Sequence, residues 1–177
     1  LSGGIGDDLI FGGAGNDALA GGDGNDVFIW QDGDGNDSID GGAGDDALVL
    51  TGTVSLGAVA ADPAFDVAID GSSGLVLVNS GAFSASIAVT AIETLSIVSG
   101  SGSDTFFSGD VAGLQQINAS LGAGDDQFFL DAGLAVAVSI DGGADSDRLR
   151  AAAGNDTLDG GAGDDSLVGQ GGDDVLI

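Results

Sequence analysis

A nine-residue repeat restricts the possible folds of this chain more than any other feature. The units GGIGDDLIF, GGAGNDALA, GGDGNDVFI, DGDGNDSID and GGAGDDALV fill residues 3–49, with Trp30 and Gln31 inserted between the third and fourth. The units GGADSDRLR, AAAGNDTLD, GGAGDDSLV and GQGGDDVLI fill residues 142–177, and two looser units, SGSGSDTFF and LGAGDDQFF, begin at Ser99 and Leu121. A fixed short period indicates a solenoid in which each unit packs on its neighbours.

Two positions of the unit keep their chemical character throughout. Position six is always aspartate: Asp8, Asp17, Asp26, Asp37, Asp46, Asp104, Asp126, Asp147, Asp156, Asp165 and Asp174. Position eight is always apolar: Ile10, Leu19, Phe28, Ile39, Leu48, Phe106, Phe128, Leu149, Leu158, Leu167 and Leu176. Position four is glycine in every unit except the one that carries Asp145.

This pattern predicts an all-β coil of turns and short strands. Glycines permit positive φ in the first six residues, so backbone carbonyls can converge while the aspartate closes the loop. The last three residues form a strand in which only position eight points inward, which predicts a single-file apolar core. Two units make one turn of the coil, so loops about eighteen residues apart lie on one side. A Ca²⁺ ion between them would take both carboxylates and loop carbonyls.

The charge balance also indicates a metal. The chain has 29 acidic residues, two arginines and a formal charge of −27, so it repels nucleic acid and anionic lipid. Multivalent cations would neutralise these carboxylates, and oxygen ligands favour Ca²⁺ or Mg²⁺. Cysteine is absent, which excludes disulfides and thiolate sites, and no apolar run is long enough to span a bilayer. We therefore expect neither nucleic-acid binding nor membrane insertion.

The units resemble the RTX repeat GGxGxDxUx of proteins exported by Gram-negative type I secretion systems; nine match it closely and two loosely. The resemblance implies a right-handed parallel β-roll that binds several Ca²⁺ ions, about five of them in well-formed sites. It implies a secreted or cell-surface location and makes all eleven position-six aspartates ligands. Glycine carbonyls would complete the coordination, at Gly13, Gly15, Gly22, Gly24, Gly161 and Gly163. Four departures predict weaker loops: Asp32, Asp145, Ala152 and Gln170.

The chain divides into a first β-roll block, 1–49, a β-rich non-repeat excursion, 50–98, and a second block, 99–177, degenerate before it becomes regular. In the excursion, FDVAID and LVLVNS flank GSSG and predict a β-hairpin, with further strands at SIAVT and ETLSIV. Both chain ends coincide with repeat boundaries, so we expect an excerpt of a longer protein.

The degenerate units predict an asymmetric second half. Asp104, Asp126, Asp147 and Asp165 are 22, 21 and 18 residues apart, close to one coil turn each, so they should stack on one face. LQQIN and LAVAVSI would be the return strands. The opposite turns, at residues 109–113 and 131–133, would lack the metal loop until Asp156 and Asp174 resume the second column.

Other features have competing interpretations. Adjacent carboxylates such as Asp7 and Asp8 suggest an acid–base pair, but they recur at turn positions and favour a structural role. Trp30 is either a stacking platform for a ligand or, more in keeping with an insertion, a packed bulge residue. Arg148 and Arg150 are expected to offset nearby carboxylates. Glu93 has no assigned role.

The sequence therefore favours a non-enzymatic calcium-binding segment of a large secreted or surface protein, of the adhesin, S-layer or matrix type, that folds on binding extracellular Ca²⁺. Its other partners would be neighbouring repeats or further copies of itself. The alternative is a calcium-dependent folding and export module of a secreted enzyme or pore-forming toxin. Ice binding is disfavoured because the loops lack ranks of threonine; their third positions begin Ile5, Ala14 and Asp23.

Overall fold

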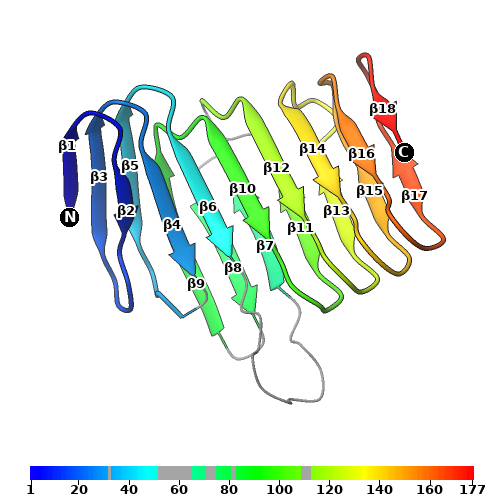
Figure 1. Ribbon diagram of the computed structural model, residues 1–177, viewed down its shortest axis with the longest axis horizontal. Helices are drawn as coiled ribbons and strands as arrows, with labels where there is room; N and C mark the ends of the chain where they lie inside the picture. The colour runs from blue at the N-terminus through cyan, green and yellow to red at the C-terminus, as the bar shows by residue number, and fades with distance from the viewer. Residues whose placement is uncertain (32, 52–64, 71–74, 81–82, 109–112) are drawn as a thin grey trace.

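The chain folds into two facing β-sheets that coil around one apolar core. The computed structural model describes residues 1–31, 33–51, 65–70, 75–80, 83–108 and 113–177. Regular structure in these segments consists of strands alone, and the coil runs from β1 (Ser2–Ile5) and β2 (Leu9–Phe11) at one end to β17 (Ser166–Val168) and β18 (Val175–Leu176) at the other (Figure 1). The predicted all-β class and parallel β-roll are confirmed.

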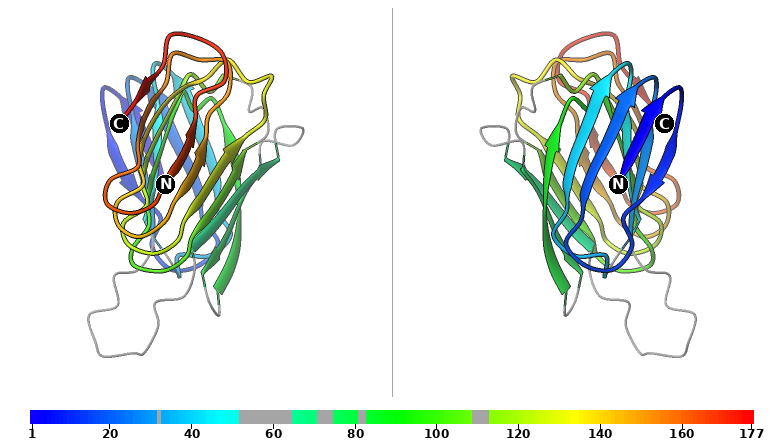
Figure 2. Two further views of the ribbon diagram at one scale, coloured as in Figure 1. Left: turned by 90° about the vertical axis from the view of Figure 1, so that its right-hand side faces the viewer. Right: turned by 90° about the vertical axis from the view of Figure 1, so that its left-hand side faces the viewer.

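The chain alternates between the two sheets. Between β1 and β17, the ten-stranded sheet contains, in spatial order, β3 (Ala18–Asp23), β5 (Ser38–Ala43), β9 (Phe83–Thr90), β8 (Leu75–Ser80), β7 (Phe65–Asp70), β11 (Thr105–Ser108), β13 (Gln127–Leu130) and β15 (Arg148–Arg150). Between β2 and β18, the eight-stranded sheet contains β4 (Val27–Gln31), β6 (Ala47–Thr51), β10 (Thr94–Val98), β12 (Gln116–Ser120), β14 (Ala137–Asp141) and β16 (Thr157–Asp159). End-on views show the sheets as two layers (Figure 2).

Parallel pairing places equivalent repeat positions side by side. In the first block, Ile10 of β2 pairs with Phe28 of β4, and Leu19 of β3 pairs with Ile39 of β5. Since side chains alternate between the faces of a strand, position eight points inward in every turn. The position-eight residues from Ile10 to Leu158 are at most 6% exposed, whereas Leu176 at the outer edge is 49% exposed.

The prediction of a single-file core was wrong for the longer strands. In β4 and β6 the strand continues past the repeat unit, so the residue two places after position eight also points inward. Trp30 and Leu50 pair in register and are at most 2% exposed, and Ile97 of β10 continues their row. Trp30 is thus a packed residue, as expected, but in a regular strand and not in a bulge. Its indole nitrogen donates a hydrogen bond of 3.1 Å to the Gly35 carbonyl.

The middle of the chain contributes to both sheets. β7 and β8 form the predicted antiparallel hairpin, whose connection at residues 71–74 lies outside the described residues. β9 pairs antiparallel with β8 and parallel with β5, while β7 pairs parallel with β11. β10 lies between β6 and β12 in the eight-stranded sheet. The division at residues 49/50 and 98/99 stays a prediction.

The second half remains within the coil. β12 and β14 are the predicted return strands, and they pair in parallel with each other. The turn after β13 is closed by a hydrogen bond of 3.0 Å from the Leu134 N–H to the Asp131 carbonyl. Residues 109–112 of the other expected turn lie outside the described residues. No helix that could cross a membrane occurs in the described part of the chain.

Candidate metal sites in the turns

The turns keep the backbone conformation that the glycines predict. The six glycines proposed as ligands all have positive φ, between 77° at Gly13 and 157° at Gly163. At Gly24, with φ of 136°, a Cβ would also lie 2.5 Å from the carbonyl oxygen of Gly6 in the preceding turn. Asp145 and Gln170, which replace glycines, retain positive φ of 80° and 74°. The loop shape therefore survives these two substitutions, while Asp32 lies outside the described residues.

The position-six aspartates form columns along the coil. The Asp8 N–H donates a hydrogen bond of 2.9 Å to Oδ1 of Asp26, and the Asp26 N–H donates one of 2.8 Å to Oδ1 of Asp46. These loops lead into the eight-stranded sheet. At the other end of the coil, the Asp156 N–H donates the equivalent hydrogen bond, of 3.0 Å, to Oδ1 of Asp174. These two loops also lead into the eight-stranded sheet.

The second column lies at the loops that lead into the ten-stranded sheet. The Asp17 N–H donates to Oδ1 of Asp37 at 2.9 Å. Further along the coil the same bond joins four aspartates at 2.7, 2.9 and 3.0 Å, in the order Asp104, Asp126, Asp147 and Asp165. The prediction that these four stack on one face is confirmed.

In six of these aspartates, within the described residues, the second carboxylate oxygen is buried without a hydrogen-bond partner. Buried Oδ2 atoms without a hydrogen bond occur at Asp8, Asp26, Asp46, Asp126, Asp147 and Asp156. A buried carboxylate oxygen without a partner is costly, so a structure that repeats it requires a compensating group. The unpartnered atom is Oδ2 in both columns, which indicates that one kind of partner would satisfy all of these oxygens.

Backbone carbonyls face these same oxygens. A Cβ on Gly142 would lie 2.5 Å from Oδ2 of Asp147 and 2.8 Å from the carbonyl oxygen of Gly160 in the next turn. A Cβ on Gly21 would likewise meet Oδ2 of Asp26 and the carbonyl oxygen of Gly41. Two acceptors that face one space repel each other unless a cation or a proton lies between them.

The electrostatics of the columns favour a cation over bare carboxylates. Desolvation raises the pKa of Asp126 to about 7, with further increases from the charges of Asp104 and Asp147 and an opposing hydrogen bond from the Asp104 backbone. Desolvation is also the main cause of the raised pKa values of Asp37, Asp46, Asp147 and Asp156. A bound cation would reverse this balance and hold the carboxylates ionised.

The donor set fits calcium. It consists of carboxylate and backbone carbonyl oxygens, which are the ligands that Ca²⁺ takes in flexible geometry. Within the described residues no group of three or more His, Cys, Asp or Glu side chains could hold a metal by itself. A calcium site in these turns would therefore combine one or two aspartates with loop carbonyls.

Position five carries a second ladder that the sequence did not reveal. Its Asn or Asp side chain accepts a hydrogen bond from the position-five N–H of the next turn, so this ladder runs opposite to the aspartate columns. The bonds measure 2.8–3.1 Å and join Asn25 to Asp7, Asp45 to Asn25, Asn36 to Asn16, Ser146 to Asp125, and Asp173 to Asn155. The recurrence of Asn or Asp before position six was the available signal. The adjacent acidic residues thus belong to two different ladders.

The Arg150 side chain on β15 contacts the neighbouring strand β13. The Arg150 guanidinium carbon lies 5.3 Å from the centre of the Phe129 ring, and Nη2 donates to the Leu130 carbonyl at 3.5 Å. Neither of these contacts is with a carboxylate. They therefore do not provide the expected compensation of acidic charge by Arg150.

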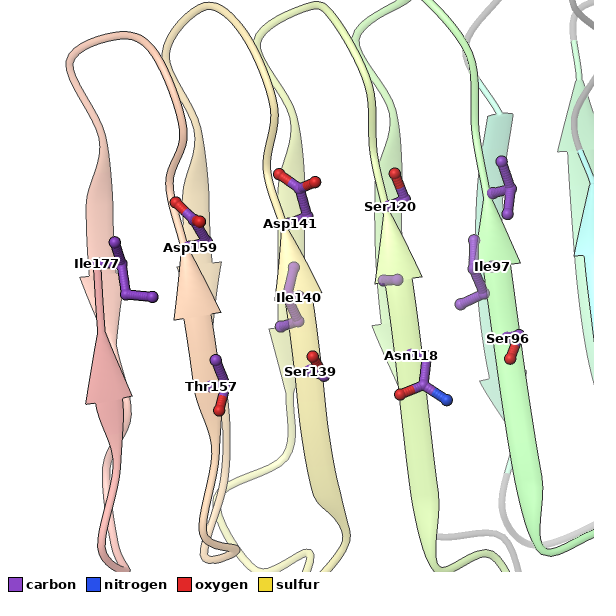
Figure 3. Close-up of a pocket in the computed structure, with 12 residues that line it drawn as sticks. Ser96, Ile97, Asn118, Ser120, Ser139, Ile140, Asp141, Thr157, Asp159 and Ile177 are labelled. Atoms are coloured by element: carbon purple, nitrogen blue, oxygen red, sulfur yellow. The ribbon is translucent and has the colours of Figure 1, made fainter.

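A shallow groove lies on the outer face of the eight-stranded sheet, lined by both polar and apolar side chains (Figure 3). Its floor is a row of uncharged side chains in register: Ser96, Asn118, Ser139 and Thr157. Asp141 and Asp159 pair beside this row. The groove lies on a strand surface, apart from the aspartate columns in the turns.

The two-layer coil with stacked Gly/Asp turns defines the class of the protein as a calcium-binding type of β-roll. The family model described as "RTX calcium-binding nonapeptide repeat (4 copies)" matches residues 1–28, 31–51 and 141–176. These segments are RTX calcium-binding nonapeptide repeats, as the sequence pattern predicted. A search of curated proteins finds no match.

Proposed function

We propose that this chain is a structural β-roll segment of a large secreted or cell-surface protein, of the adhesin, S-layer or matrix type, and that it folds when extracellular Ca²⁺ fills its turns. The supporting observation is the row of buried, unpartnered Oδ2 atoms that face backbone carbonyls. The position-six aspartates and the loop glycines supply the ligands. We propose no catalytic role.

Calcium supplies the free energy that the bare fold lacks. In the unfolded chain the carboxylates are hydrated, whereas folding without a cation buries them beside other acceptors. If each site binds with a Kd of about 0.1 mM, calcium at about 1 mM stabilises the fold by about 1.4 kcal/mol per site. About five such sites contribute about 7 kcal/mol, which is comparable with the whole stability of a domain.

The assumed affinity is compatible with the proposed extracellular location, and the outer edges of the coil support the proposed assembly. Sites in the range of about 0.1–1 mM are typical of extracellular calcium modules. At one edge, Leu9 and Phe11 of β2 are 61% and 53% exposed; at the other, Val175 and Leu176 of β18 are 53% and 49% exposed. Apolar edge strands of this kind are suited to stacking against neighbouring repeats or a further copy.

Calcium titration of the calcium-free chain tests this function. Far-UV circular dichroism should change cooperatively from coil to β, and fluorescence of Trp30, the chain's one tryptophan, should report its burial in the same transition. Mg²⁺ should be a poor substitute because it requires tighter octahedral geometry. A complete β spectrum with buried Trp30 in excess chelator would contradict the proposal.

A further inference from the structure

Glu93, which lies outside the nonapeptide segments, continues the first aspartate column. The Asp46 N–H donates a hydrogen bond of 2.8 Å to Oε2 of Glu93, just as the Asp26 N–H donates to Oδ1 of Asp46. The Thr94 N–H donates to the Asp46 carbonyl at 2.9 Å, as the Ala47 N–H does to the Asp26 carbonyl. Glu93 thus occupies the position of a position-six aspartate.

The turn that carries Glu93 is shorter than a repeat turn. Asp40 pairs with Thr90 before the turn, and Ala47 pairs with Thr94 after it. The six residues 41–46 therefore lie against only three, residues 91–93. Glutamate has one more methylene than aspartate, and this longer side chain reaches the Asp46 N–H from the shortened turn.

An independent observation indicates that a ligand binds here. Asp46 is 1% exposed, and its Oδ2 is buried without a hydrogen-bond partner. A Cβ on Gly41 would lie 2.6 Å from this oxygen and would also meet the Ala91 carbonyl oxygen. The Ala91 carbonyl therefore takes the place that the Gly41 carbonyl takes beside Asp26 one turn earlier.

We propose that Glu93 closes one additional Ca²⁺ site, in which the ion is held by the Glu93 carboxylate, Oδ2 of Asp46 and the Ala91 carbonyl. This inference rests on the proposed calcium function of the columns. It extends calcium binding beyond the repeat units into the middle of the chain, where the nonapeptide pattern is absent.

The column of carboxylates ends at Glu93. In the next turn, Gln116 pairs with Thr94, which places Gln115 in the position-six register, and the Gln115 N–H donates to the Glu93 carbonyl at 2.8 Å. Gln115 carries no charge. Glu93 is therefore a terminal ligand with one acidic neighbour in the column, and its neutralisation should remove one ion.

Calcium stoichiometry of the 177-residue chain tests the assignment. Native mass spectrometry and calorimetric titration with CaCl₂ should show one Ca²⁺ fewer for Glu93→Gln than for the parent chain. Asp141→Asn is the matched control, because it removes the same charge from the exposed groove of the eight-stranded sheet and should leave the count unchanged. Equal counts for all three chains would overturn the site. A parent chain that binds no calcium would instead overturn the calcium function itself.

A second measurement does not depend on a variant. Glu93 is the only glutamate, so incorporation of [δ-¹³C]glutamate labels this one carboxylate. The isotope-edited infrared bands should move to the positions of a metal-bound carboxylate when Ca²⁺ is added. Bands that stay at the hydrated-carboxylate positions, in a calcium-loaded chain whose circular dichroism shows the β fold, would refute the role of Glu93 while leaving the repeat sites intact.

Discussion

Asp126 is the residue at which calcium and protons should compete most strongly. Its side chain is fully buried, Oδ1 accepts the Asp104 N–H, and Oδ2 has no partner. Desolvation and the neighbouring charges raise its pKa from 3.8 to about 7. In the absence of a cation, the folded state therefore prefers the protonated carboxyl below about pH 7.

The sign of the pH effect follows from this shift. Between pH 3.8 and about 7 the folded, calcium-free chain binds more protons at Asp126 than the unfolded chain, so stability falls as pH rises through this window. A shift of roughly three pKa units corresponds to a loss of at most about 4 kcal/mol above pH 7, and solvent screening reduces it. Below pH 3.8 this loss is absent.

Neutralising Asp126 should therefore have opposite effects with and without calcium. Asp126→Asn removes the buried charge and keeps an acceptor for the Asp104 N–H, so it should stabilise the calcium-free chain at pH 8. With calcium, the same change removes a proposed ligand and should cost about 1–3 kcal/mol. Asp125→Asn is the control, because this adjacent exposed residue has the same charge and asparagine occupies its position in other units.

The assay is urea unfolding, followed by circular dichroism, in chelator and in 5 mM CaCl₂ at pH 5 and pH 8. For the parent chain, the stabilisation by calcium should be larger at pH 8 than at pH 5, and Asp126→Asn should reduce this difference. Asp125→Asn should behave like the parent. Destabilisation by Asp126→Asn of equal size in both solutions would refute the competition between proton and metal.

Two further substitutions test the stacking of the turns. Asp26→Ala should raise the calcium midpoint of folding more than Asp174→Ala, because Asp26 is bonded to both Asp8 and Asp46, whereas Asp174 is bonded to Asp156 alone; equal midpoints would argue against ions shared between turns. Phe128→Ala should cost about 3–5 kcal/mol in calcium, because Phe128 is fully buried and stacks on Phe106 at 4.3 Å. Phe129→Ala, on the outer face beside Arg150, should cost at most about 1 kcal/mol, and equal losses would contradict the assigned faces.

The sequence predicted the columns and the first row of the core because a solenoid converts sequence period directly into spatial stacking. Asp104, Asp126 and Asp147 lie in line despite their uneven spacing, because each interval is close to one coil turn. The same logic failed for the core where strands lengthen. The row of Trp30 and Leu50 lies beyond the nine-residue unit, so a pattern defined by that unit does not contain it.

Glu93 was missed for a related reason. Its turn has lost three residues, so neither the glycines nor the repeat length remain to mark it. The surviving signal is short: Glu93, Thr94 and Leu95 repeat the acid, variable, apolar order of Asp46, Ala47 and Leu48. This order is too common to identify a turn until strand pairing shows Thr94 beside Ala47.

The two side-chain ladders leave one carboxylate oxygen of a turn available for the proposed calcium ion. In the turn of residues 21–26, the Asn25 N–H is bonded to Asp7 of the preceding turn and the Asp26 N–H to Asp46 of the following one. Both amides have side-chain partners within the protein, while Oδ2 of Asp26 is buried without a hydrogen-bond partner. Since an unpaired buried acceptor costs more than an ordinary hydrogen bond contributes, a cation at this atom should strengthen the association of neighbouring turns.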